Sequence, residues 1–142
     1  MSVLKRFRTV SEYQPLTDAK DLRGQLMNWA LNENNIPKKK RVLFLEDLKN
    51  ICNSLVHNIK EAMKAYPKDE ESLNRRKHCL SLALDNCIDL WDELQFIDDV
   101  QTFSNPINLD KLEPCLTLLF KEYNALRKSR DNAKIITKDK KS

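Results

Sequence analysis

The chain has 142 residues, of which 41% are hydrophobic and 32% charged, and its formal net charge is +4. Its only glycine is Gly24, which argues against nucleotide-loop enzymes and most β architectures, because phosphate-cradling loops and tight hairpins need several glycines at fixed places. No apolar run approaches the roughly 18 residues needed to span a bilayer. The basic stretch from Met1 to Val10 lacks the apolar run of a signal peptide, and the four cysteines form no C-x-x-C pair. We therefore expect one cytoplasmic domain with reduced thiols and no membrane contact.

Apolar residues return every three or four positions in four segments, which is the period of an amphipathic helix. The first segment spans about residues 18–34, with Thr17 or Asp18 as its cap. The segment ends before Pro37, because proline disfavours a helical conformation in the residue that precedes it. The second segment spans about residues 41–65, and its apolar stripe is wide enough to pack against two neighbours.

The third predicted helix opens at Asp69, where acidic residues favour the positive end of the helix dipole, and it ends somewhere between residues 97 and 103. A turn is expected at Asn105–Pro106. The fourth helix spans about residues 110–130, with Asp110 and Glu113 as a capping box.

These four helices predict an all-α fold, an up-down-up-down antiparallel four-helix bundle, because short connections place consecutive helices antiparallel. We assign residues 17–130 to the bundle, residues 1–16 to an N-terminal arm and residues 131–142 to a disordered basic tail. The sequence does not decide whether the arm is a short strand, an extra helical turn or an ordered extension. Trp29 and Trp91 lie on apolar stripes and are predicted to anchor the core.

Basic residues gather in three clusters, whereas residues 80–126 contain two basic residues against nine acidic ones. The clusters are Lys38, Lys39, Lys40 and Arg41; Arg75, Arg76 and Lys77; and Arg127, Lys128 and Arg130. In the predicted bundle the first two lie near opposite ends, so they make a long basic track that can follow a phosphate backbone. The alternative is that these are solvated surface charges that keep the protein soluble.

Residues suited to catalysis or metal binding do not form a convincing group. Asp85, Asp89 and Asp92 recur at helical spacing, but they flank the apolar stripe, and neither histidine lies three residues after a glutamate as a carboxylate-metal bundle requires. His78 and Cys79 are adjacent and so do not face each other on a helix. We therefore predict a non-enzymatic protein without metal or cofactor.

Pro37–Arg41 has the form P-K-x-x-R, and a later helix opens with Arg75 and Arg76 and carries Leu80-Ser81-Leu82-Ala83-Leu84. In these features the chain resembles the accessory variability determinant (Avd) family of diversity-generating retroelements. More distantly, it is similar to the bundle proteins encoded by intervening sequences of ribosomal RNA genes. The resemblance implies a four-helix bundle that forms a homo-oligomer, a ring of five subunits, with a basic surface. It also implies, as partners, a reverse transcriptase and its template RNA or an RNA/DNA hybrid. Lys38, Lys39, Lys40 and Arg41 occupy the family's motif, and Arg75 and Arg76 match its basic helix opening.

The leading hypothesis is an RNA-binding accessory subunit that binds a reverse transcriptase and its template during mutagenic retrohoming. The alternative is a helical protein–protein interaction module, such as a phage or toxin–antitoxin component, in which acidic and basic faces pair between subunits. A carboxylate-metal bundle enzyme is the third option.

Overall fold

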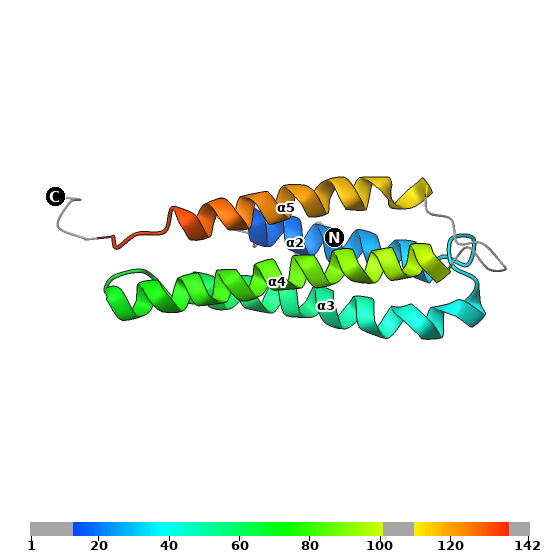
Figure 1. Ribbon diagram of the computed structural model, residues 1–142, viewed down its shortest axis with the longest axis horizontal. Helices are drawn as coiled ribbons and strands as arrows, with labels where there is room; N and C mark the ends of the chain where they lie inside the picture. Colours follow the sequence, from blue (N-terminus) through cyan, green and yellow to red (C-terminus); the bar gives the residue numbers. More distant parts are fainter. Residues whose placement is uncertain (1–12, 101–109, 137–142) are drawn as a thin grey trace, which may run out of the picture.

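The computed structural model describes residues 13–100 and 110–136, and every regular element within these ranges is helical. The long helices are α2 (Gln14–Leu31), α3 (Lys38–Lys64), α4 (Glu70–Val100) and α5 (Glu113–Asp131), and the 3-10 turn η1 (Asp110–Leu112) precedes α5. The four long helices lie side by side along one axis (Figure 1). For the described residues, the all-helical prediction is confirmed.

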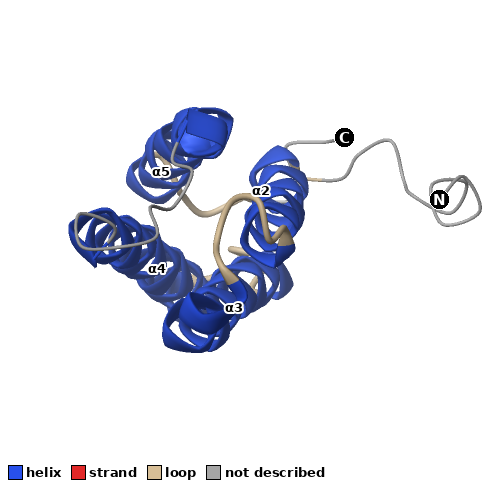
Figure 2. Ribbon diagram, turned by 90° about the vertical axis from the view of Figure 1, so that its right-hand side faces the viewer, coloured by secondary structure: helices blue, strands red, loops and turns tan. Residues whose placement is uncertain are grey.

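Viewed from one end, the four helices surround a common centre (Figure 2). Each helix packs against the next one along the chain, and α5 packs against α2. One apolar core fills the centre with residues from all four helices. Its largest fully buried apolar side chains are Phe44, Leu22, Leu26, Ile36, Leu48, Leu55, Ile59, Leu80, Leu90, Ile97 and Leu126.

Helix α2 starts earlier than the sequence predicts. It begins at Gln14 with Tyr13 as the N-cap residue, so neither Thr17 nor Asp18 caps it. Pro15 lies in the first turn, where its fixed φ angle suits a helix and its missing N–H group leaves no hydrogen bond unmade. Residues 14–16, assigned above to the arm, therefore belong to a helix, and residues 1–12 lie outside the described part of the chain.

Helices α4 and α5 begin in different ways. The Asp69 carboxylate accepts a hydrogen bond from the Ser72 backbone N–H at 2.8 Å, and Ser72 Oγ accepts one from the Asp69 N–H at 3.1 Å, which satisfies donors at the start of α4. The capping box predicted at Asp110 and Glu113 is wrong. Leu112 is the N-cap residue of α5 and makes no side-chain capping hydrogen bond, because η1 occupies the place of the expected first turn.

The chain beyond α5 continues toward the end of the bundle that holds the connection between α3 and α4 (Figure 1). The backbone N–H of Ile136 donates to the Pro67 carbonyl oxygen at 2.8 Å. Residues 132–136, the first part of the predicted tail, thus lie beside the bundle. The remainder of that tail, and the turn predicted at Asn105–Pro106, fall outside the described residues.

Candidate nucleic-acid interface

The first basic cluster forms the opening turn of α3, not a loop before it. Lys38 and Lys39 are exposed, Lys40 and Arg41 are half-buried, and this turn contains no acidic residue. Cations are unfavourable at the N-terminus of a helix, because the unpaired N–H groups there already carry partial positive charge. The stability of α3 therefore does not explain why four basic residues stand at its start.

Arg41 is directed toward the protein. Its side chain is 19% exposed, and its guanidinium Nη2 lies 3.7 Å from a carboxylate oxygen of Glu33, near the start of the α2–α3 connection. The Nε and Nη2 atoms are buried without a hydrogen-bond partner among the described residues. Within this cluster, Lys38 and Lys39 are consequently the side chains that a ligand in solvent can reach.

Arg76, from the second cluster, holds the end of α3. Its Nη1 atom donates to the Ala62 carbonyl oxygen at 3.1 Å and to the Ala65 carbonyl oxygen at 3.5 Å. The last carbonyl groups of a helix lack partners within the helix, so a cation at this point satisfies them and suits the negative end of the dipole. Arg76 is therefore a structural residue in this fold.

The second and third clusters lie near the same end of the bundle. Arg130 Nη1 donates to Ser81 Oγ at 3.4 Å, which joins the end of α5 to the first half of α4. Arg130 also pairs with Asp131 at 3.2 Å. The start of α3 lies at the opposite end (Figure 1). The structure thus brings two of the three clusters together and leaves the first one apart.

Helical spacing places part of this joined group along the seam between α4 and α5. Lys77 precedes Ser81 by four residues and Arg127 precedes Arg130 by three, so each lies on the same helix face as a partner in the Ser81–Arg130 hydrogen bond. Arg127 is exposed and Lys77 is half-buried. We call Lys77, Arg127 and Arg130 the basic end of the seam. Arg75 and Lys128 are exposed nearby on the same two helices.

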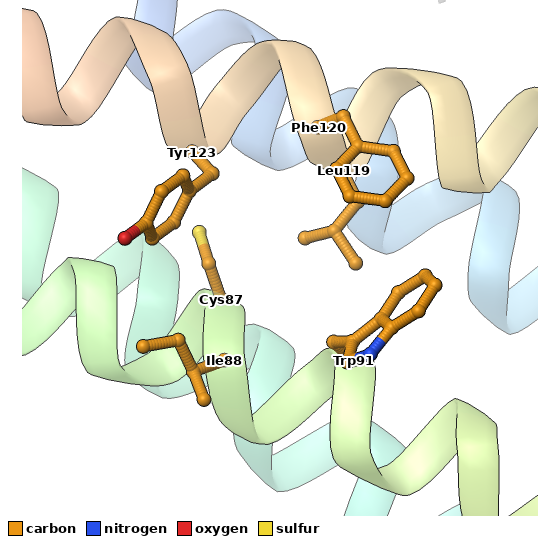
Figure 3. Close-up of a pocket in the computed structure, with 6 residues that line it drawn as sticks. All are labelled: Cys87, Ile88, Trp91, Leu119, Phe120 and Tyr123. Atoms are coloured by element: carbon orange, nitrogen blue, oxygen red, sulfur yellow. The ribbon is translucent and has the colours of Figure 1, made fainter.

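Further along the seam is an apolar pocket that the sequence patterns did not indicate. Its cavity volume is about 180 Å³, and Cys87, Ile88 and Trp91 of α4 line it opposite Leu119, Phe120 and Tyr123 of α5 (Figure 3). Cys87 and Leu119 are buried at its floor, whereas Phe120 is 54%, Ile88 46% and Trp91 39% exposed. The rings of Trp91 and Phe120 stand 5.2 Å apart across the seam.

Trp91 is therefore not the core anchor that the sequence predicts, although Trp29, which is 4% exposed, is one. Position 91 lies on the edge of the α4 stripe, where it meets α5 and solvent together. One feature of the sequence could have indicated the pocket. Phe120 and Tyr123 are three residues apart on α5, and they make its apolar face wider than packing in the bundle interior requires.

Next to this pocket is a second pocket whose lining includes acidic residues. Trp91 also lines a second cavity of about 370 Å³, together with Leu94, Gln95, Asp98, Asp110, Leu112, Glu113 and Leu116. The two cavities adjoin at Trp91 on α4 and α5, and together we call them the α4–α5 groove. From its basic end, the seam becomes apolar and then acidic over its length.

One carboxyl group is buried beside this seam without a partner. Glu122 is 0% exposed, and neither of its carboxylate oxygens has a hydrogen-bond partner among the described residues. Burial, reinforced by the charge of Asp18, raises the pKa of Glu122 to about 8. Asp18 itself accepts a hydrogen bond from Gln14 at 2.9 Å and pairs with Lys121 at 3.3 Å. Glu122 is thus largely protonated at pH 7.

The cysteines are free thiols whose environments disfavour the thiolate. Burial raises the pKa of Cys52 and of Cys87 to about 12 and that of Cys115 to about 11. Since the thiolate is the nucleophile and the metal ligand, these thiols are not activated in this fold. Within residues 13–100 and 110–136, no three His, Cys, Asp or Glu side chains are grouped closely enough to hold a metal ion.

Fold and site together define a small helical-bundle protein with a charged, grooved seam. No family model matches the chain, and neither the curated proteins nor the solved structures contain a match. Among the described helices, none combines the length and the apolar character that crossing a membrane requires.

Proposed function

We propose that the protein is a non-enzymatic accessory subunit that binds RNA and protein on an up-down-up-down antiparallel four-helix bundle. The topology is supported by the short α2–α3 and α3–α4 connections and by the packing of each helix against its neighbour in sequence. The partners we propose, from the family resemblance, are a reverse transcriptase and its template RNA or an RNA/DNA hybrid. The same resemblance suggests a homo-oligomer, a pentamer. The four free thiols favour a cytoplasmic location.

The observation that carries RNA binding is the opening turn of α3. Lys38 and Lys39 are exposed there at the positive end of the helix dipole, where their charge lowers helix stability. A bound phosphate would neutralise this repulsion and would also meet the free N–H groups of the first turn. The basic end of the seam, with Lys77 and Arg127, supplies a second contact for the same backbone.

The distance between these two sites suits an extended polyanion. From Lys77 to the end of α4 at Val100, the helix rises through 23 residue steps, which corresponds to about 35 Å at 1.5 Å per residue. The exposed carboxylates Asp85, Asp89 and Asp92 lie between the two sites on α4. They would repel phosphate, so the strand would have to pass along another face of the bundle.

The test is the salt dependence of RNA binding. In Lys38→Ala/Lys39→Ala, the slope of log K against log salt concentration should fall by about 1.4, because each phosphate contact on a single strand contributes about 0.7. The control Lys49→Ala/Lys60→Ala removes the same charge from the same helix and should leave the slope unchanged. Equal slopes for the two variants and the parent would remove the opening turn of α3 from the binding surface.

The α4–α5 groove favours a second candidate function, a helical protein–protein interaction module that does not bind nucleic acid. Exposed aromatic residues beside a pocket and an acidic extension are typical of a helix-binding surface. Mixing the purified protein with structured RNA at about 0.15 M salt separates the candidates, since only the accessory subunit should form a complex at that ionic strength.

A further inference from the structure

The apolar pocket between α4 and α5 has room for one compact group. Tyr123 stands on one side of its opening, Trp91 and Phe120 stand on the other, and Cys87 and Leu119 lie between them (Figure 3). The cavity volume of about 180 Å³ is below the roughly 300 Å³ at which pockets for drug-sized ligands begin. The pocket therefore takes a group of a few heavy atoms.

Aromatic rings supply three of the six residues that line this pocket. Trp91 and Phe120 are partly exposed, and their ring centroids stand 5.2 Å apart with the planes tilted by 49°. Tyr123 is half-buried on the facing side of the opening. Because the face of an aromatic ring is the negative part of its quadrupole, a group held against these faces is favoured when it carries positive charge.

The charges on α4 have the same preference. Asp85 lies three residues before Ile88 and Asp92 lies four residues after it, so both exposed carboxylates share a helix face with this rim residue. Asp89 is exposed directly after Ile88. Helix α4 carries no lysine or arginine after Lys77. The α4 side of the pocket thus attracts cations and repels anions.

The basic residues of α5 do not cancel this field. Lys121 pairs with Asp18 of α2 at 3.3 Å, away from α4. Arg127 is exposed four residues, or one helical turn, beyond Tyr123, where it belongs to the basic end of the seam. Positive charge is therefore found at one end of the pocket only.

The lining offers almost no hydrogen bonds to a charged occupant. Its polar groups are the Tyr123 hydroxyl, the Trp91 indole N–H and the Cys87 thiol, which burial keeps protonated by raising its pKa to about 12. A primary ammonium or guanidinium group would lose its water here without gaining enough acceptors for its N–H groups, which is costly. A quaternary ammonium group has no N–H groups, and its methyl groups suit apolar walls.

We propose that this pocket binds the quaternary ammonium group of a small molecule, held between Tyr123 and the pair of rings formed by Trp91 and Phe120. The assignment goes beyond RNA binding and does not depend on it, because the two surfaces share no residue. It is incompatible with a partner helix anchored in the same pocket, since both occupants need the same space.

The first test uses the unmodified full chain and two probes of the same shape. Choline carries a trimethylammonium group, and 3,3-dimethylbutan-1-ol is its neutral counterpart with carbon in place of nitrogen. Titrations followed by saturation-transfer NMR, at matched ionic strength, should give choline a Kd about tenfold lower, because cation–π contacts in a partly desolvated site supply about this factor. Equal binding of the two probes, tighter binding of the neutral one or binding of neither would overturn the proposal.

A second test removes one ring at a time and keeps the pocket apolar. Trp91→Leu and Phe120→Leu should each weaken choline binding by about fivefold and change the affinity for the neutral probe by less than about twofold. Phe96→Leu removes a partly exposed ring from the α3 side of the same helix and should change neither affinity. Equal losses for the two probes would show that the rings provide apolar contact alone, which would overturn the proposal.

A third test leaves the pocket lining intact and changes only the surrounding charge. Asp85→Asn/Asp92→Asn should weaken choline binding by about threefold at low salt and leave the neutral probe unaffected. The control Glu70→Gln/Glu71→Gln removes the same charge from the start of α4, about 20 Å before Asp85 and beyond the Debye length of about 10 Å at 0.1 M salt. Equal choline affinities in these two variants would contradict the charge selection on which the proposal depends.

Discussion

Helix α4 takes part in two seams that differ in how completely they are closed. Toward α3, Phe96 covers the buried ring of Phe44 at 5.7 Å in an edge-to-face contact, and Asn58 donates to Asn86 at 2.7 Å. Toward α5, Trp91 and Phe120 meet beside an open pocket, and Glu122 is buried without a hydrogen bond. The α3–α4 seam packs its aromatic rings and pairs its amides, and only one oxygen of Glu93, near Asp47 of α3, is known to be buried there without a hydrogen bond among the described residues. The α5 side instead leaves a pocket open and a fully buried carboxyl group, that of Glu122, without a hydrogen bond.

The largest expected effect comes from opening the closed seam. Phe44→Ala should lower the free energy of unfolding by about 4 kcal/mol, because a fully buried aromatic ring is replaced by a cavity and its contact with Phe96 is lost. The measurement is urea denaturation followed by circular dichroism. Val42→Ala, at an 82% exposed position on the same helix, should stay within about 0.5 kcal/mol. Similar losses in both would contradict the contrast between the seams.

The intermediate effect is a gain in stability on the α5 side. The pKa of Glu122, about 8, lies above its ordinary value of 4.5. Between these pH values the folded state binds more protons than the unfolded one, so stability falls as pH rises. Glu122→Gln should therefore be more stable than the parent by about 3 kcal/mol at pH 8 and nearly equal to it at pH 4.5.

The measurement is the unfolding free energy of both proteins between pH 4.5 and 8. The groups that face or adjoin Glu122 are Asp18 on α2, Cys87 on α4, Lys121 on α5 and Tyr13 before α2. Glu113→Gln, at an exposed position of the same helix, is the matched control and should keep the slope of the parent. A slope that survives in Glu122→Gln would assign the pH dependence to another group.

The smallest effect tests the polar contact within the closed seam. Asn58→Ala should cost about 1 kcal/mol, the usual net contribution of one hydrogen bond, because half-buried Asn86 loses its partner. A double-mutant cycle with Asn86→Ala measures the coupling, which should be about 1 kcal/mol if the pair acts as a unit. Additive losses would show that the two residues contribute independently.

The helices themselves were predictable, because their apolar residues recur at the helical period and their ends are set by local chemistry. Pro37 and Asp69 mark boundaries that the structure retains. The boundary at Gln14 was missed, since Pro15 resembles a breaker but serves as a first-turn residue. The sequence shows where the basic residues are, but it does not show which of them bind within the protein and which face solvent. Arg76 holds the end of α3 and Arg41 turns toward Glu33, and both contacts join residues that sequence spacing does not relate.

The sequence by itself determined which segments become helices and which faces are apolar, because both depend on interactions within a few residues. Only the tertiary structure decided which apolar residues stay exposed, since that depends on how closely two helices approach. Trp91 and Trp29 occupy similar stripes, yet only Trp29 is enclosed on all sides. In the same way, Glu122 appears on α5 as an ordinary polar residue, and the packing of α2 and α4 around it makes its charge costly.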